Sequence, residues 1–121
     1  MSRKQLLSEA EEAQVRLAID RNPRAPLPRA RLALHCWRSG DLAAALEWRD
    51  SCLEIDPNHV DYYRIRANIQ VDLHQSARAV ETAQRAIAIL PESVMAYLLA
   101  TRMLLADLHP ARAQHMLDKA L

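Results

Sequence analysis

Small and apolar side chains recur along this chain at a fixed interval of 34 residues. Three alanines share one position of the interval, and four small residues, each followed by an apolar one, share another. The alanines are Ala45, Ala79 and Ala113, and the small–apolar pairs are Ala18–Ile19, Cys52–Leu53, Ala86–Ile87 and Ala120–Leu121. Proline keeps the same interval at Pro23, Pro57 and Pro91. Because small residues let two helices approach closely and proline ends a helix, the pattern predicts helix pairs repeated in tandem.

Start and stop signals divide the chain into seven expected helices. Ser8 and Glu11 have the spacing of a capping box, and Asp41 follows Gly40 where it can cap a new helix. Pro110 suits the first turn of the last helix. The expected helices cover about residues 8–20, 24–38 (with its starting turn), 41–55, 60–73, 76–89, 94–106 and 110–120.

Composition supports an all-α fold. The chain has one glycine and no phenylalanine, and it is rich in residues that favour helices. Sheet proteins need turn glycines and β-branched or aromatic residues, which are sparse here. Cys36 and Cys52 have no metal-ligand spacing, so we interpret them as reduced core thiols, with an internal disulfide as the minor alternative.

The segment from Ser39 to Pro57 resembles the second helix of a tetratricopeptide repeat, with its turn glycine, two small-residue positions and closing Asp-Pro. The resemblance covers about residues 8–121. It implies an all-α, right-handed superhelical stack of antiparallel helix pairs, an α-solenoid of about three repeats. The single domain, residues 1–121, would comprise a lone N-terminal helix and three repeats: 8–25, 26–59, 60–93 and the incomplete 94–121.

Some positions depart from the family pattern. Tyr63 and Tyr97 supply the aromatic residue common early in the first helix, but the first repeat has an arginine there. Second-helix aromatic positions hold Arg49 and Ala83, and Arg66 stands where leucine is usual. These departures bear on the packing of the middle of the chain more than on the fold.

In this family the first helix of each repeat lines a concave groove that binds extended or helical peptides. The resemblance implies that the groove is lined by Leu27, Ala30, Leu34, Trp37 and Arg38, then Asp61, Arg64, Asn68, Val71 and Asp72, then Met95, Leu98, Arg102, Leu105 and Ala106. From these the expected binding residues are Leu34, Trp37, Arg38, Arg64, Asn68, Val71, Leu98, Arg102 and Leu105. Tryptophan and arginine are frequent anchors of binding energy, and exposed apolar patches commonly mark binding sites.

Some members of the family hold a terminal carboxylate between basic and amide side chains. Arg64 and Asn68 resemble the first half of such a clamp. Leu99 stands where the completing amide is needed, so a full clamp is not expected.

The sequence therefore predicts a non-catalytic scaffold that binds another protein, as a peptide or helix, in its groove. No metal site is expected, because the five histidines form neither HxxxH nor HExxH. One glycine cannot form a phosphate loop, and no nucleophile motif is present. No cofactor is expected. The absence of a signal-peptide pattern or a membrane-length apolar run favours the cytoplasm, and the composition is typical of a bacterial protein.

Two alternatives stay open at this point. Solenoid ends need a polar cover, and no capping helix follows the last repeat. Its apolar side could instead meet a second copy, forming a homodimer through the C-terminal end, or the rest of a longer protein from which an accessory domain was cut. The residues of that face are Leu99, Met103, Met116 and Leu121. RNA binding is not expected, since 16 basic residues nearly balance 15 acidic ones and leave a net charge of +1.

Overall fold

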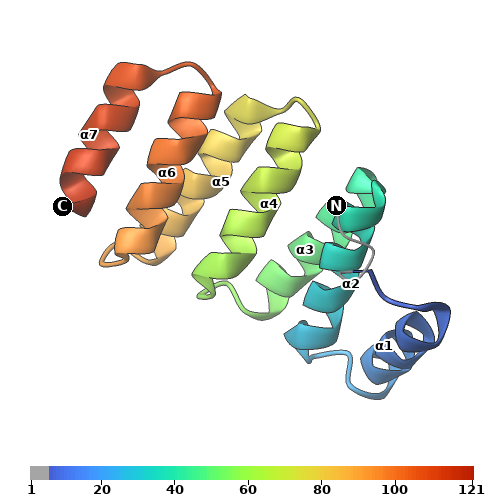
Figure 1. Ribbon diagram of the computed structural model, residues 1–121. Helices are drawn as coiled ribbons and strands as arrows, with labels where there is room; N and C mark the ends of the chain where they lie inside the picture. The colour runs from blue at the N-terminus through green and yellow to red at the C-terminus, as the bar shows by residue number, and fades with distance from the viewer. Residues whose placement is uncertain (1–5) are drawn as a thin grey trace. The chain divides into compact units, whose positions relative to one another are not determined.

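The computed structural model describes residues 6–121, and the regular structure in that range is entirely α-helical (Figure 1). Its helices are α1 (Glu9–Arg21), α2 (Pro26–Ser39), α3 (Leu42–Ile55), α4 (Val60–Asp72), α5 (Ser76–Ile89), α6 (Val94–Ala106) and α7 (Pro110–Ala120). The prediction of an all-α fold is confirmed, and the expected helix ends agree with the observed ones to within one or two residues.

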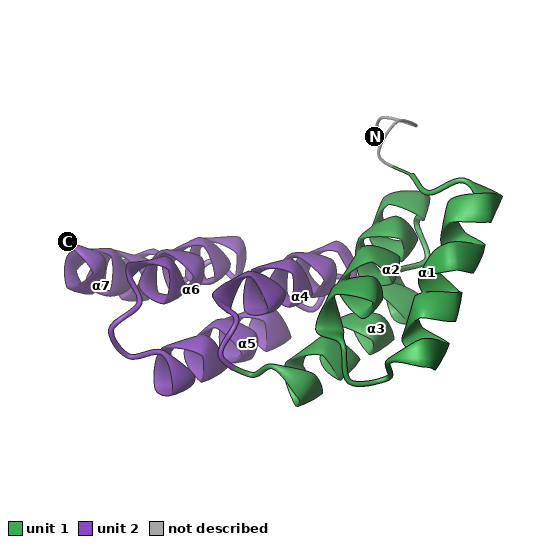
Figure 2. Cartoon of the chain, turned by 90° about the horizontal axis from the view of Figure 1, so that it is seen from below, with its two compact units in different colours: residues 1–57 green, residues 58–121 purple. Residues whose placement is uncertain are grey.

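The chain divides into two units, each with its own packed helices (Figure 2). Unit 1 extends to Pro57 and contains α1, α2 and α3, of which α2 packs against both of its neighbours. Unit 2 begins at Asn58 and contains α4 to α7. In unit 2 each helix packs against the next, and α4 also packs against α6. The division falls next to the predicted start of a repeat at residue 60.

Side-chain caps fix several helix starts. Glu11 donates its backbone N–H to Ser8 Oγ at 3.1 Å, and Ser8 donates its own to Glu11 Oε1 at 3.2 Å. This is the capping box expected from the sequence, and hydrogen bonding of the Glu11 carboxyl, first to the Ser8 backbone N–H and then to the Ser8 side chain, lowers its pKa. Asp41 caps α3 as predicted, accepting from the Ala44 N–H at 3.2 Å. Ser93 caps α6 in the same way.

The turn between the two helices of each pair has one backbone geometry in three copies. Gly40, His74 and Leu108 are 34 residues apart and have positive φ angles of 93°, 59° and 60°. In each turn the next residue donates its N–H to the carbonyl five positions before it. These bonds join Asp41 to Cys36 (2.9 Å), Gln75 to Gln70 (2.8 Å) and His109 to Leu104 (2.7 Å). This is the Schellman arrangement, which normally places glycine at the left-handed residue.

Unit 1 is held together by apolar contacts among its helices. Val15 and Ile19 of α1 and Leu32 of α2 form a buried cluster, against which Leu7 and Trp48 pack. The guanidinium groups of Arg16 and Arg29 lie 6.0 Å and 5.8 Å from the Trp48 ring centre. Trp48 therefore joins α3 to α1, with a favourable cation–π contribution from both arginines.

Two departures from the family pattern are resolved by polar contacts within the helix pairs. Arg49 is fully buried in unit 1 and donates to the Ala30 carbonyl at 3.5 Å. In unit 2, Arg66 donates to Thr82 Oγ1 at 2.7 Å, and Thr82 donates to Gln70 Oε1 at 2.5 Å. A buried polar network is tolerated where its members satisfy one another. The middle of the chain thus keeps the helix-pair geometry with polar side chains at positions usually apolar.

The thiols of Cys36 and Cys52 are buried and free, as expected. Cys52 occupies the small-residue position of α3 and donates from Sγ to the Pro26 carbonyl at 3.6 Å. Burial raises the pKa of Cys52 to about 11 and also raises that of Cys36. Neither thiol has the depressed pKa of a reactive cysteine.

Replacing Leu108 by glycine should raise the free energy of unfolding by about 0.5–1 kcal/mol, because relief of a left-handed backbone, which costs about 1–2 kcal/mol for a residue with a Cβ, exceeds the roughly 0.5–1 kcal/mol of extra entropy that glycine loses on folding. Leu108 is 85% exposed, so little burial is lost. Urea denaturation followed by circular dichroism measures the change. The matched control is Gln84→Gly at an exposed position of α5, which should be destabilising by a similar amount. A loss of stability in both variants would contradict the strain at Leu108.

The alkaline stability of the chain should depend on Cys52. Its pKa of about 11 in the folded chain exceeds the ordinary value of 9.0, so the folded state retains the thiol proton more tightly. The resulting stabilisation is complete below pH 9 and is lost as pH rises towards 11, by at most about 1.4 kcal/mol per pH unit. Urea denaturation from pH 8 to 11 should show a steeper fall for the wild type than for Cys52→Ala. Alanine is the residue at the equivalent position of α5. Equal slopes would contradict the prediction.

Candidate functional site

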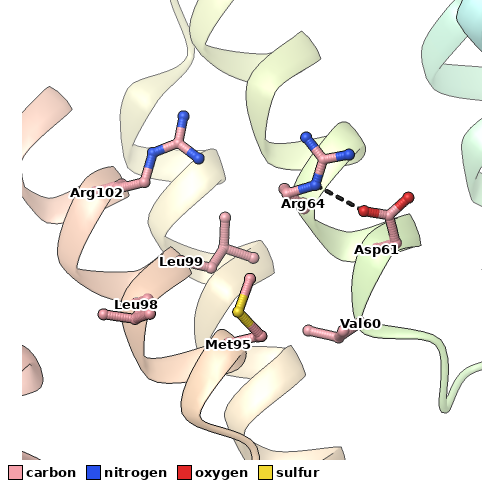
Figure 3. A pocket seen from close by; sticks show the side chains of 7 residues that line it. All are labelled: Val60, Asp61, Arg64, Met95, Leu98, Leu99 and Arg102. Carbon is pink, nitrogen blue, oxygen red and sulfur yellow. Dashed lines mark hydrogen bonds and ion pairs between the residues drawn. The ribbon is translucent and has the colours of Figure 1, made fainter. Parts of the chain in front are cut away.

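Unit 2 has a pocket between α4 and α6, the first helices of its two helix pairs (Figure 3). It has a volume of about 170 Å³, and most of its lining is apolar. The lining residues are Val60, Asp61 and Arg64 from α4, and Met95, Leu98, Leu99 and Arg102 from α6. Pockets that are mostly apolar with a few polar groups at the edge are typical of binding sites.

Helical spacing explains why these side chains meet. On α6 the lining residues recur at intervals of three and four, which places them on one face of a helix. The opposite positions, including Ala96, Ala100 and Leu104, are buried in the core of unit 2. Since α5 and α7 pack against α6 and α4 also lies beside it, the face that carries Met95 and Arg102 remains open.

The polar groups of the pocket are two guanidiniums and one carboxylate. Arg64 donates from Nε to Asp61 Oδ1 at 2.7 Å, in an ion pair on one turn of α4. Arg102 is exposed, and no acidic side chain among residues 6–121 forms an ion pair with it. The positive charge of the pocket is therefore compensated at Arg64 and uncompensated at Arg102.

The structure brings three of the predicted binding residues together in this pocket, namely Arg64, Leu98 and Arg102. Asp61 and Met95, which the predicted groove face also included, join them. Asn68 and Val71 are half-buried farther along α4 and do not line the pocket, and Leu105 is exposed beyond it. The prediction missed Val60, because it was taken only as the first residue of a helix.

Unit 1 contains the other three predicted binding residues, Leu34, Trp37 and Arg38, which lie half-buried on α2. Leu34 and Arg38 line a second pocket of about 140 Å³, together with Leu7, Arg31 and His35. The Leu7 N–H donates to His35 Nδ1 at 3.2 Å, so the segment before α1 lies against this face of α2. The sequence signal for that contact is the leucine pair directly before the Ser8 cap.

The predicted self-association face is not exposed as a set. Leu99 and Met103 are each 3% exposed and belong to the interior of unit 2, whereas Met116 is half-buried and Leu121 exposed. The prediction is therefore wrong for Leu99 and Met103, because helices packed on α6 already cover them. Leu99 instead lines the pocket.

Nothing among the described residues indicates a metal centre, since no three metal-ligating side chains of the His, Cys, Asp and Glu types lie together in residues 6–121. Across the same range no helix combines the length and apolar character required to cross a membrane.

Comparison with known proteins identifies the fold but not a family. No family model matches the chain, and no curated protein matches it in sequence. Among solved structures, two described as crystal structures of MamA superpose with a TM-score of 0.76 at 14% identity, over 93% and 91% of this chain. A MamA RS-1 ArsTM double mutant gives a TM-score of 0.73 at 20% identity over 93%.

These matches cover 61%, 64% and 63% of the MamA chains, so this chain spans less than two thirds of their length. MamA is a tetratricopeptide-repeat protein. The chain therefore has the tetratricopeptide-like fold that its sequence predicted, and this fold is similar to that of MamA.

Proposed function

We propose that this chain is a non-catalytic scaffold that binds another protein by receiving an apolar side chain of a peptide or helix in the pocket between α4 and α6. The observation that carries the proposal is Met95, which is 54% exposed at the open side of an apolar pocket. Leu98 lies beside it, half-buried. Grouped apolar side chains in a concavity are a common basis for docking a partner's side chain.

The buried core residues of α4 and α6 indicate that the pocket is rigid. Ala96 and Ala100 are buried on the reverse of α6, and Ile65 and Ile69 are buried on α4. Because these residues fix both helices within unit 2, the pocket is formed before any partner arrives. A preformed site loses less conformational entropy on binding. The volume of about 170 Å³ suits one or two apolar side chains rather than a whole small molecule.

The chemistry of the site favours binding over catalysis. The Asp61 carboxylate is exposed and already engaged by Arg64, so it is not held towards the pocket as a general acid or base would be. The buried thiols have raised pKa values and lie outside the pocket. The fold is one that generally serves protein interaction.

The proposal is tested by selecting peptides from a random displayed library against the whole chain and measuring their affinity for variants by fluorescence anisotropy. Met95→Asp places a charge at the apolar wall and should weaken the selected peptides at least about tenfold, because a charge buried without a partner is costly. The control is Ile89→Asp on α5, which is 46% exposed and lies outside the pocket. The selected peptides should bind Ile89→Asp with the same affinity as they bind the wild type.

Circular dichroism of both variants establishes that the fold is kept. Failure to enrich any peptide, or equal affinity for the wild type and Met95→Asp, would contradict the proposed site.

A further inference from the structure

The charge at the edge of the unit 2 pocket is distributed unevenly. Two guanidiniums and one carboxylate line it, for a formal charge of 2 − 1 = +1. Asp61 lies 2.7 Å from Arg64 and compensates that arginine. Figure 3 shows both guanidinium groups towards one end of the pocket, with Met95 and Val60 at the other. The pocket thus has an apolar end and a positive end.

Arg102 is the source of the uncompensated charge. It is the one charged residue among the 13 residues of α6, whose other members are apolar, small or hydroxyl-bearing. The helical neighbours of Arg102 at three and four positions on either side are Leu98, Leu99, Leu105 and Ala106, so no acidic side chain on its own helix is within reach. The facing helix offers Asp61, which is engaged by Arg64.

We propose that the occupant of this pocket is an internal segment of a partner protein with an apolar side chain and an acidic side chain about one helical turn apart. The proposal rests on the proposed function and names its partner chemistry. The apolar side chain packs on Met95, Leu98 and Leu99, and the carboxylate pairs with Arg102. Since Leu98 and Arg102 are one turn apart on α6, about 5–6 Å along its axis, the two groups of the partner need the same separation.

Charge complementarity selects this occupant. A guanidinium offers a carboxylate two parallel hydrogen bonds, and such charge-assisted bonds are stronger than neutral ones. The acid is placed on a side chain because the apolar lining residues and Arg102 suit two side chains one turn apart. A clamp for a terminal carboxylate combines basic and amide side chains, and Asn68 lies outside the pocket. An acidic residue two positions away in an extended segment, or three to four positions away in a helix, meets the required spacing.

The test uses the tightest peptide from the library selection, synthesised with both ends blocked and as a second form in which its acidic residue is replaced by the matching amide. We expect the selected peptides to carry an acidic residue within four positions of an apolar one. Neutralising the peptide, or replacing Arg102 by glutamine, should each weaken binding about tenfold. The neutral peptide should bind Arg102→Gln no more weakly than it binds the wild type, because both changes remove the same contact.

Two matched variants locate the effect. Arg64→Gln should weaken binding less than Arg102→Gln, because Asp61 already compensates Arg64. Arg85→Gln, at an exposed position of α5 outside the pocket, should leave the affinity unchanged. Raising the salt concentration should weaken the binding of the acidic peptide more than the binding of its amide form.

The outcomes separate this inference from the proposed function. Peptides that lose affinity for Met95→Asp but lack an acidic residue, or that bind Arg102→Gln as well as the wild type, would overturn the acidic partner and leave the pocket as the binding site. The acidic partner would also be overturned if binding required a free C-terminus on the peptide and did not change when its acidic residue was replaced by the matching amide. Peptides insensitive to both variants would overturn the pocket itself.

Discussion

A small side chain at one place in the second helix of every pair is the constraint on which this molecule depends. Ala45, Ala79 and Ala113 are fully buried in α3, α5 and α7. A larger residue there would hold the two helices apart, since helix packing distance is set by the side chains at the contact. Close packing of the pairs in turn determines which face of each first helix is buried and which stays open. The pocket of unit 2 is formed by the faces of α4 and α6 that stay open in this packing.

The periodic part of the sequence predicted the periodic part of the structure. Helix ends marked by proline, by Ser8 with Glu11, and by Asp41 were correct because each acts through neighbours in sequence. The left-handed turns at His74 and Leu108 carry no such signal. Glycine is the residue from which this turn can be predicted, and of the three turns only the one at Gly40 contains it. The other two turns are held by the helices on either side, which override a local preference for a different backbone.

Part of the pocket lining was predicted from the sequence, for the same reason. Helical spacing from the family resemblance selected Arg64, Leu98 and Arg102 correctly as neighbours on open faces. Spacing alone could not separate residues that line the pocket from Asn68 and Val71 on the same helix, because that depends on how α4 and α6 approach. Leu99 was misplaced because burial is a tertiary property. Leu7 against His35 is a contact across 28 residues that no repeat pattern encodes.

Because α4 to α7 form a unit of their own, everything the pocket needs lies within residues 58–121. Its walls come from two helices with a shared core behind them, and its charge comes from one ion pair and one further arginine. On α6 that arginine follows a run of apolar residues that the core has only partly buried, with Met95 and Leu105 more than half exposed. In the function proposed above, Arg102, one turn from Leu98 at the edge of the apolar surface, belongs to a recognition pattern in which burial supplies affinity and charge supplies orientation.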